Sequence, residues 1–274
     1  MSGGTWTTQN KVLPGVYIRF KSAAGAGLTV SDRGTVAICE PLSWGPQAVV
    51  QTVEAGADWA PFTGYAGAAP QNRFLQEIFK GSNRTAAPKK VLLYRPAAAE
   101  SATAAATIGD LTATALYPGV RGNDISVIVV DNEDDSFTVQ TVVDVEIVDE
   151  QNVATMAELQ ANAWVKFSGE GAFTATTGQV LTGGADGTVS ASAYATFLTA
   201  IEPYQFDILI YDGTDVNVAY SMVAFVKRIA EENGQYAQLV AANLNKPDSR
   251  FVINVASGVT LDDGTELSAA QACW

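Results

Sequence analysis

The sequence contains no histidine and only two cysteines in 274 residues. Without histidine, the chain cannot form a Ser-His-Asp or Cys-His nucleophile system. The two cysteines, Cys39 and Cys273, lie far apart in the sequence and provide neither an ordinary zinc site nor a disulfide framework. Cys39 ends an apolar run, which predicts a small buried side chain there.

Positive charge is also scarce: 16 Lys and Arg face 29 Asp and Glu, and the net charge is −13. The basic residues are scattered, so no basic stripe is present to neutralise phosphates, and we expect no direct binding to nucleic acid. No apolar run approaches the ~20 residues of a membrane-spanning helix. Residues 1–11 lack the layout of a signal peptide. The sequence therefore predicts a chain that folds in the cytoplasm and does not insert into a membrane.

Motifs that hold cofactors are missing too. The sequence has no Gly-x-x-x-x-Gly-Lys-Ser/Thr loop and no Gly-x-Gly-x-x-Gly after a strand, so no cofactor is expected. For enzymology this leaves carboxylate or lysine chemistry. The densest acidic cluster comprises Asp131, Glu133, Asp134 and Asp135. A solvated hairpin tip is favoured over a calcium loop, because Ser136 occupies the position of the required glycine. A carboxylate-based hydrolase is the least favoured interpretation.

The composition itself is 47% hydrophobic and 16% charged. It suits a subunit whose surface is covered by neighbours, and it equally suits an ordinary α/β domain. Four aromatic residues lie in Gly/Pro-rich loops, as interface anchors or as plugs of the core. They are Trp44, Trp59, Phe62 and Tyr65.

A short strand is predicted near the start of the chain. Val16, Ile18 and Phe20 share one side of an extended segment, and Tyr17 lies on the other side. Small, flexible residues follow it. The strand either pairs with a sheet edge of another subunit or begins the chain's own domain.

Element patterns divide the chain into four parts. These are an N-terminal arm (1–27), an N-terminal α/β part (28–100), a β-sandwich-like domain (101–182) and an α/β domain (183–274). In the last part, buried strands such as 206–211 alternate with helices. That alternation is typical of a doubly wound, mostly parallel sheet.

Several local elements are specific enough to test. Residues 137–148 are predicted as one alternating β segment with Val145 on its apolar face. Residues 155–158 fit the capping box of a helix. Ser192 is predicted to cap one helix and Asp215 to cap a longer one.

The most informative stretch is residues 115–127, where aromatic, proline, glycine and Asn-Asp residues precede a β-branched run. This pattern predicts a shaped turn that delivers the chain into a strand. Glycines permit unusual backbone angles, and Asn and Asp side chains fix turns. No chemistry is needed at such a site, so a structural role is favoured over a catalytic one. Its candidate residues are Tyr117, Gly119, Gly122, Asn123 and Asp124.

Four segments of the sequence carry a resemblance to a known family. They lie at 13–18, 117–125, 181–187 and 259–268. In this order they resemble the opening arm, the Tyr-x-Gly-x-x-Gly-Asn element, the entry into the subtilisin-like domain, and the segment before the last helices of contractile tail sheath proteins. The resemblance is to the kind encoded by phages and prophages of Gram-positive bacteria and by phage-tail-like particles.

The resemblance implies a structural subunit that is not an enzyme. Such subunits stack as six-fold rings around a tail tube, and baseplate triggering converts the stack into a shorter, wider sheath that drives the tube through the bacterial envelope. The implied partners are other sheath subunits, the tail tube protein and the baseplate, in a tail assembled in the host cytoplasm. The arm strand would join a neighbour's sheet through Leu13, Val16, Tyr17, Ile18 and Phe20. A non-sheath tail or surface assembly module is the alternative.

The last residues depart from the family. Residues 268–274 are predicted as a helix without a C-cap, whereas family members usually continue further. We therefore expect a shortened form that lacks a C-terminal domain and its arm.

Overall fold

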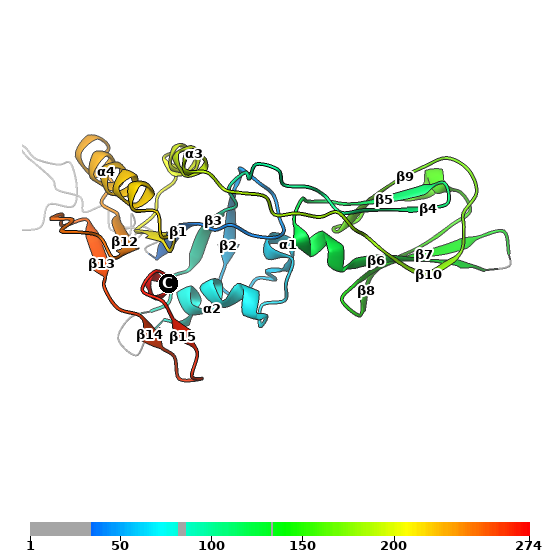
Figure 1. Ribbon diagram of the computed structural model, residues 1–274, viewed down its shortest axis with the longest axis horizontal. Coiled ribbons are helices and arrows are strands. Elements are labelled where there is room, and N and C mark those ends of the chain that lie inside the picture. Colours follow the sequence, from blue (N-terminus) through cyan, green and yellow to red (C-terminus); the bar gives the residue numbers. More distant parts are fainter. Residues whose placement is uncertain (1–33, 82–85, 133) are drawn as a thin grey trace, which may run out of the picture. The chain divides into compact units, whose positions relative to one another are not determined.

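The computed structural model describes residues 34–81, 86–132 and 134–274 (Figure 1). The predicted arm strand, with Leu13, Val16, Tyr17, Ile18 and Phe20, lies outside the described residues. The described chain contains a six-stranded mixed sheet with helices on both faces, and a separate sandwich of two antiparallel sheets. It is therefore a mixed α/β chain that carries a β-sandwich.

The six-stranded sheet is built from both ends of the described chain. Its order is β13-β12-β11-β1-β3-β2, and all neighbours are parallel except β2 and β3. The strands are β1 (Thr35–Cys39), β2 (Val50–Glu54), β3 (Lys90–Tyr94), β11 (Ile208–Tyr211), β12 (Gln238–Ala242) and β13 (Val252–Val255). Strands from the predicted parts 28–100 and 183–274 thus share one sheet, although the sandwich separates them in sequence.

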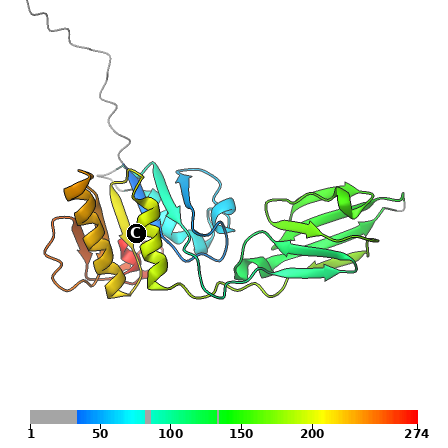
Figure 2. The ribbon, with the colours of Figure 1, turned by 90° about the horizontal axis from the view of Figure 1, so that it is seen from above.

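Helices cover both faces of this sheet because its central strands are apolar on both sides. Val36 and Ile38 of β1 pack with α2 (Arg73–Lys80), while Ala37 and Cys39 face the opposite layer. That layer consists of α3 (Ala191–Ile201) and α4 (Val216–Glu232), which lie on the same side of the strands (Figures 1 and 2). Cys39 is buried, as the sequence predicts.

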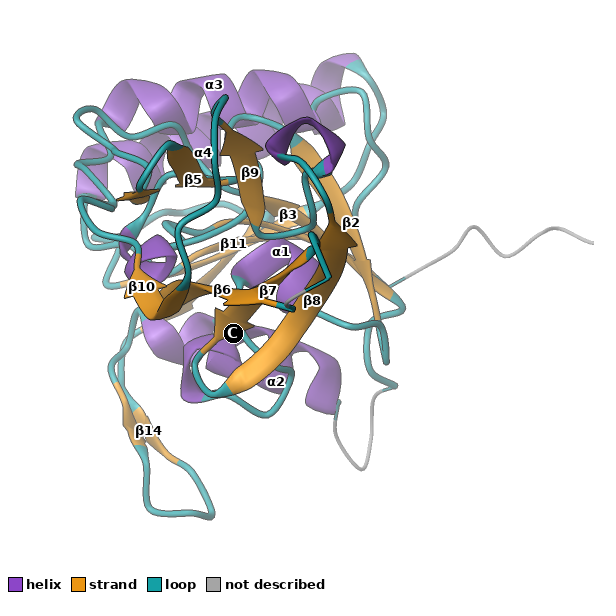
Figure 3. Ribbon diagram, turned by 90° about the vertical axis from the view of Figure 1, so that its right-hand side faces the viewer, coloured by secondary structure: helices purple, strands orange, loops and turns teal. Residues whose placement is uncertain are grey.

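The sandwich is formed by sheets of order β10-β6-β7-β8 and β4-β5-β9 (Figure 3). Alternate residues such as Leu111, Val127 and Val139 point into the core between the two sheets. The strands are β4 (Ala105–Ile108), β5 (Leu111–Ala115), β6 (Ile125–Asp131), β7 (Phe137–Val143), β8 (Glu146–Val153), β9 (Val165–Ser168) and β10 (Thr176–Val180). The acidic cluster lies at the β6–β7 hairpin, as predicted, with residue 133 outside the described residues.

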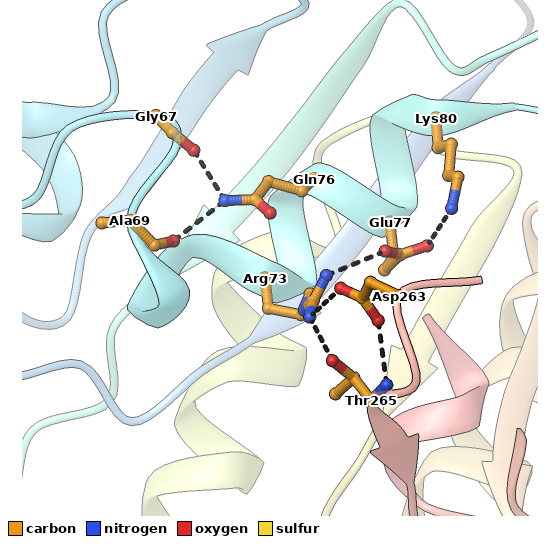
Figure 4. A network of polar contacts seen from close by, with 8 residues as sticks. All are labelled: Gly67, Ala69, Arg73, Gln76, Glu77, Lys80, Asp263 and Thr265. Atoms are coloured by element: carbon orange, nitrogen blue, oxygen red, sulfur yellow. Dashed lines mark hydrogen bonds and ion pairs between the residues drawn. The ribbon is translucent and has the colours of Figure 1, made fainter. Parts of the chain in front are cut away.

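A small hairpin and a short turn follow the last strand of the six-stranded sheet. Strands β14 (Val259–Thr260) and β15 (Glu266–Leu267) are held to α2 by Arg73, whose guanidinium donates to Asp263 Oδ2 at 2.8 Å and to Thr265 Oγ1 at 2.7 Å (Figure 4). The backbone N–H of Thr265, followed by Arg73, holds the pKa of Asp263 well below its usual range. The remaining short elements are α1 (Ala60–Thr63), η1 (Pro70–Asn72), η2 (Val120–Asp124), η3 (Met156–Glu158) and η4 (Gln271–Cys273).

Several local predictions are confirmed. The acidic cluster forms a hairpin tip and Cys39 is buried, as described above. Asp215 caps α4 by accepting the backbone N–H of Asn217 at 2.9 Å.

Four local predictions are wrong. The segment 137–148 is a hairpin: Val143 pairs with Glu146, and Val145 is 91% exposed in the turn, because Asp144 adopts a φ of 56° and turns the chain. Residues 155–158 form only the short turn η3, and residues 268–274 contain η4 in place of a running helix. Helix α3 begins at Ala191 with Ser190 in the N-cap position, so Ser192 lies inside it.

Candidate functional site at the sandwich junction

The predicted turn lies where the sandwich meets the loops of the six-stranded sheet. Gly119 has a φ of 135°, and a Cβ placed there would lie 2.0 Å from the carbonyl oxygen of Ser43. Only glycine allows this close approach. The carboxylate of Asp186 holds both sides, since it accepts the backbone N–H of Val120 at 2.8 Å and the hydroxyl of Ser43 at 3.0 Å.

Asn123 joins this turn to the Gly-Gly segment at 183–184. Its side-chain amide donates to the carbonyl of Gly184 at 3.0 Å and accepts the N–H of Gly184 at 2.8 Å. A Cβ on Gly184 would lie 2.4 Å from the carbonyl oxygen of Gly119. The second and third of the four segments that carry the family resemblance are therefore in direct contact.

The chain enters and leaves the sandwich along one paired route. The outgoing and returning segments form antiparallel bridges at Ala99 with Thr188, Ala102 with Ala185, and Ala105 with Thr182. Each pair exchanges backbone hydrogen bonds of 2.8–3.0 Å. The sandwich is thus an insertion between β3 and β11 whose two connections support one another.

Arg121, within the turn itself, is the most strongly connected side chain of the junction. Its guanidinium donates to both carboxylate oxygens of Asp144 at 2.8 Å, to Asp124 at 3.0 Å and to the carbonyl of Gly64 at 2.8 Å. It also lies 4.3 Å from the ring centroid of Tyr65. Burial lowers the pKa of Arg121, but hydrogen bonds to the two carboxylates outweigh burial and the net shift is upward. The same interaction favours the charged form of Asp144, because the hydrogen bond with Arg121 lowers the pKa of Asp144.

A second buried arginine donates hydrogen bonds to backbone carbonyls. Arg95, at the end of β3, donates to the carbonyl of Gly45 at 2.7 Å and to the carbonyl of Pro118 at 2.7 Å. Burial lowers the pKa of Arg95 to about 10, which still leaves the side chain charged at neutral pH. It therefore fixes a loop of the six-stranded sheet to the loop that precedes η2.

Aromatic side chains fill the space between these polar contacts. Trp44 is 1% exposed and packs edge-on against Tyr117, with ring centroids 5.4 Å apart, and 4.9 Å from the ring of Trp164. Of the loop aromatics, Trp44 and Trp59 are thus core residues, while Phe62 and Tyr65 are half-buried.

The structure brings all five predicted turn residues into this junction. Sequence reasoning missed Arg95 and Arg121, as well as Ser43. One feature of the sequence could have indicated a role for Arg121: it lies between the two glycines of the turn, in a chain with few basic residues.

The junction attaches the sandwich to the loops of the six-stranded sheet through directional hydrogen bonds. Within residues 34–81, 86–132 and 134–274, no group of three or more His, Cys, Asp or Glu side chains could hold a metal ion. None of the helices in the described part of the chain is long and apolar enough to cross a membrane. Arg95 and Arg121 each bind carbonyl oxygens or carboxylates of the same chain, so their hydrogen-bonding capacity serves the fold.

Comparison with protein families gives two matches, which together cover residues 97–274. Residues 97–186 match the phage tail sheath protein beta-sandwich domain, and residues 187–274 match the phage tail sheath protein central domain. The chain belongs to the phage tail sheath protein family. The change from one domain match to the next falls among the paired residues 182–188 of the returning connection.

Known proteins similar to this sheath chain include two from Bacillus subtilis. The uncharacterized protein YqbK is 35% identical over 99% of the chain, and the phage-like element PBSX protein XkdK is 34% identical over 99%. The sheath tail protein of Desulfitobacterium hafniense aligns with a TM-score of 0.84 and 40% identity over 94% of the chain, and that of Listeria innocua with 0.75 and 32% over 88%. The chain spans 61% of each Bacillus protein, and 60% and 55% of the two solved chains.

Proposed function

We propose that this chain acts as a structural subunit of a contractile tail sheath, which surrounds the tail tube and contracts to drive it through the bacterial envelope. The observation that carries the proposal is the succession of two sheath domains in one chain, together with the TM-score of 0.84 to a sheath tail protein at 40% identity. Assembly with other sheath subunits follows from the family.

Finer features belong to the same proposal. The partners beyond other subunits are the tail tube protein and the baseplate, the site of assembly is the bacterial host cytoplasm, and the chain performs no catalysis. The six-stranded sheet is proposed to be the doubly wound, subtilisin-like domain of the family. Its parallel central strands and the helices on both faces support this assignment.

The division into an arm (1–27), two α/β parts (28–100 and 183–274) and a sandwich (101–182) is likewise proposed. Tyr117, Gly119, Gly122, Asn123 and Asp124 form the structural turn that orients the sandwich. This proposal is supported by the close approach of the turn to Ser43 and by its hydrogen bonds with Gly184 and Asp186.

The arm is proposed to link neighbouring subunits through Leu13, Val16, Tyr17, Ile18 and Phe20. Two features of the sequence support this role: the alternation of apolar residues and the distribution of charge. Residues 1–33 hold four of the 16 basic residues but only one of the 29 acidic residues. A weakly basic segment is attracted to the acidic remainder of a second copy, and strand addition would supply backbone hydrogen bonds.

Immunogold electron microscopy tests the proposal on the particle in which the chain occurs. Antibodies raised against the purified chain should label the tail shaft along its whole length. In contracted particles the label should occupy a shorter, wider zone that leaves part of the tube bare. Label confined to the tail tip, the capsid or the cell surface would favour the non-sheath assembly module instead.

A further inference from the structure

Two carboxyl groups meet at the carboxyl ends of neighbouring parallel strands. Strands β1 and β11 pair in the register Val36 with Ile208 and Ile38 with Ile210. Two residues further along each chain, the same register places Glu40 beside Asp212. Adjacent strands lie about 4.8 Å apart and side chains alternate between faces, so both carboxyls extend the face of Ile38.

The terminal turn η4 covers this pair. The indole N–H of Trp274 donates to Asp212 Oδ2 at 2.9 Å, and its ring packs near Phe74, with centroids 6.4 Å apart. Cys273 is buried in the same cluster. The Oε2 atom of Glu40 is shielded from solvent and accepts no hydrogen bond from a donor among the described residues. The site therefore contains a carboxyl oxygen that lacks a protein donor.

The titratable groups packed around the pair come from several elements, and each of them becomes negative when it ionises. They are Cys39 of β1, Tyr211 of β11, Tyr194 of α3 and Cys273 of η4. Burial, followed by the charge of Asp212 and a hydrogen bond with it, raises the pKa of Glu40 well above its usual range. Burial also raises the pKa of Cys273 and that of Tyr211 to about 12, so both side chains stay neutral at neutral pH and add no charge beside the carboxyl pair.

We propose that Glu40 and Asp212 share one proton, and that this shared proton holds residues 268–274 against the carboxyl edge of the sheet. The proton resides on Glu40 and bridges to Asp212, while the other oxygen of Asp212 receives the Trp274 indole. Loss of the proton leaves two carboxylates side by side in a shielded site, which is strongly unfavourable. Separation of the carboxylates breaks the indole contact and releases η4.

The direction of the pH dependence follows from linkage. A group whose folded pKa is raised stabilises the closed form fully below its free value of 4.5, and this stability is lost as pH rises through the folded value. Between these two pKa values the closed form binds one more proton than the open form. The opening constant of η4 therefore rises about tenfold per pH unit in that interval.

Backbone amide exchange of the purified chain measures this opening. The N–H groups of Ala272, Cys273 and Trp274 donate to Ser268, Ala270 and Gln271 within the turn, at 2.7, 3.1 and 3.1 Å. From pH 5 upward, their protection factors should fall about tenfold per unit in the wild type. They should stay constant in Glu40→Gln, which keeps a neutral donor. The matched control Glu54→Gln changes an exposed glutamate of β2 and should keep the wild-type slope.

Two results would overturn the proposal: protection that does not depend on pH in the wild type, or a wild-type slope that persists in Glu40→Gln. Infrared difference spectroscopy provides an independent readout on the wild type, so the outcome does not depend on the folding of the variant. A protonated carboxyl band should be present in the folded chain at pH 6, absent in Glu40→Gln and retained in Glu54→Gln. Its absence from the folded wild type also refutes the shared proton.

Discussion

Replacement of Arg121 with alanine would remove the side chain that makes the most polar contacts at the junction. Arg121 is 4% exposed, and its guanidinium donates two hydrogen bonds of 2.8 Å to Asp144. It also supplies the N–H that reaches the carbonyl of Gly64, and it lies over the ring of Tyr65. Alanine leaves the Gly64 carbonyl without this donor and opens a space between the turn and the loop.

The magnitude follows from the exposure of each partner. The side chain of Asp144 is 60% exposed, so water replaces the lost guanidinium and the ion pair itself contributes only ~0–1 kcal/mol. The shielded carbonyl of Gly64 that loses its donor costs ~1–3 kcal/mol, and the lost stacking on Tyr65 costs ~0.5–1 kcal/mol. We therefore expect Arg121→Ala to lower the free energy of unfolding by about 1.5–5 kcal/mol.

Urea unfolding followed by tryptophan fluorescence measures this loss, with Arg228→Ala as the matched control. Arg228 also makes two 2.8 Å contacts with one carboxylate, that of Glu202, but the two side chains are 40% and 34% exposed. Solvent screens that pair, so its removal should shift the unfolding midpoint much less. Arg121→Lys keeps the charge but not the fork of donors, and should fall between wild type and Arg121→Ala. Equal losses for Arg121→Ala and Arg228→Ala would refute the reasoning.

Three further predictions concern the same unfolding assay. Gly119→Ala should destabilise the chain by at least ~1 kcal/mol more than Gly56→Ala. Both glycines have positive φ, but only at Gly119 would a new Cβ collide with neighbouring backbone. Equal losses of stability would show that the loop adjusts freely. The hydrogen bond with Arg121 lowers the pKa of Asp144 in the folded chain. The stability that ionised Asp144 contributes is therefore present above its ordinary pKa of 3.8 and is lost as pH falls through the lower folded value. If the stability of Asp144→Asn between pH 5 and 2 follows the same profile as that of the wild type, this expectation is wrong. Asp215→Ala should cost ~1 kcal/mol through loss of the α4 N-cap, with Asp215→Asn as the control that retains most of it.

The elements that the sequence predicts correctly are those whose signals are local. The run Thr35–Cys39 is buried on both faces and is apolar throughout, which is typical of a parallel strand. Asp215 directly precedes an apolar-periodic segment, so its capping role is visible without knowledge of the rest of the chain. The turn at 117–124 combines local and distant contacts: its glycines and Asn-Asp pair are visible in the sequence, but Asn123 binds Gly184, 61 positions later, and Gly119 lies against Ser43.

The predictions that fail depend on contacts between distant residues. Residues 137–148 alternate like one strand, whereas the chain turns at Asp144, whose carboxylate is bound by Arg121, 23 positions earlier. The pairing of β1 with β11 is likewise invisible locally, although Asp207 accepts the backbone N–H of Thr35 at 3.1 Å across 172 positions. Periodicity describes which residues are buried, but it does not say which distant segment covers them.

The buried charged side chains are concentrated at the junction. Among the residues that the structure describes, Arg95 and Arg121 are the buried charged side chains, and both lie at this junction. Apolar side chains would fill the same volume without the cost of removing charge from water. They would not fix direction, however, since apolar contact is non-directional. The guanidinium of Arg95 binds the Gly45 and Pro118 carbonyls and that of Arg121 binds the Gly64 carbonyl, and such hydrogen bonds are directional. The junction therefore joins the sandwich to the loops of the six-stranded sheet through directional polar contacts, whereas the interior of each part is an apolar core of its own.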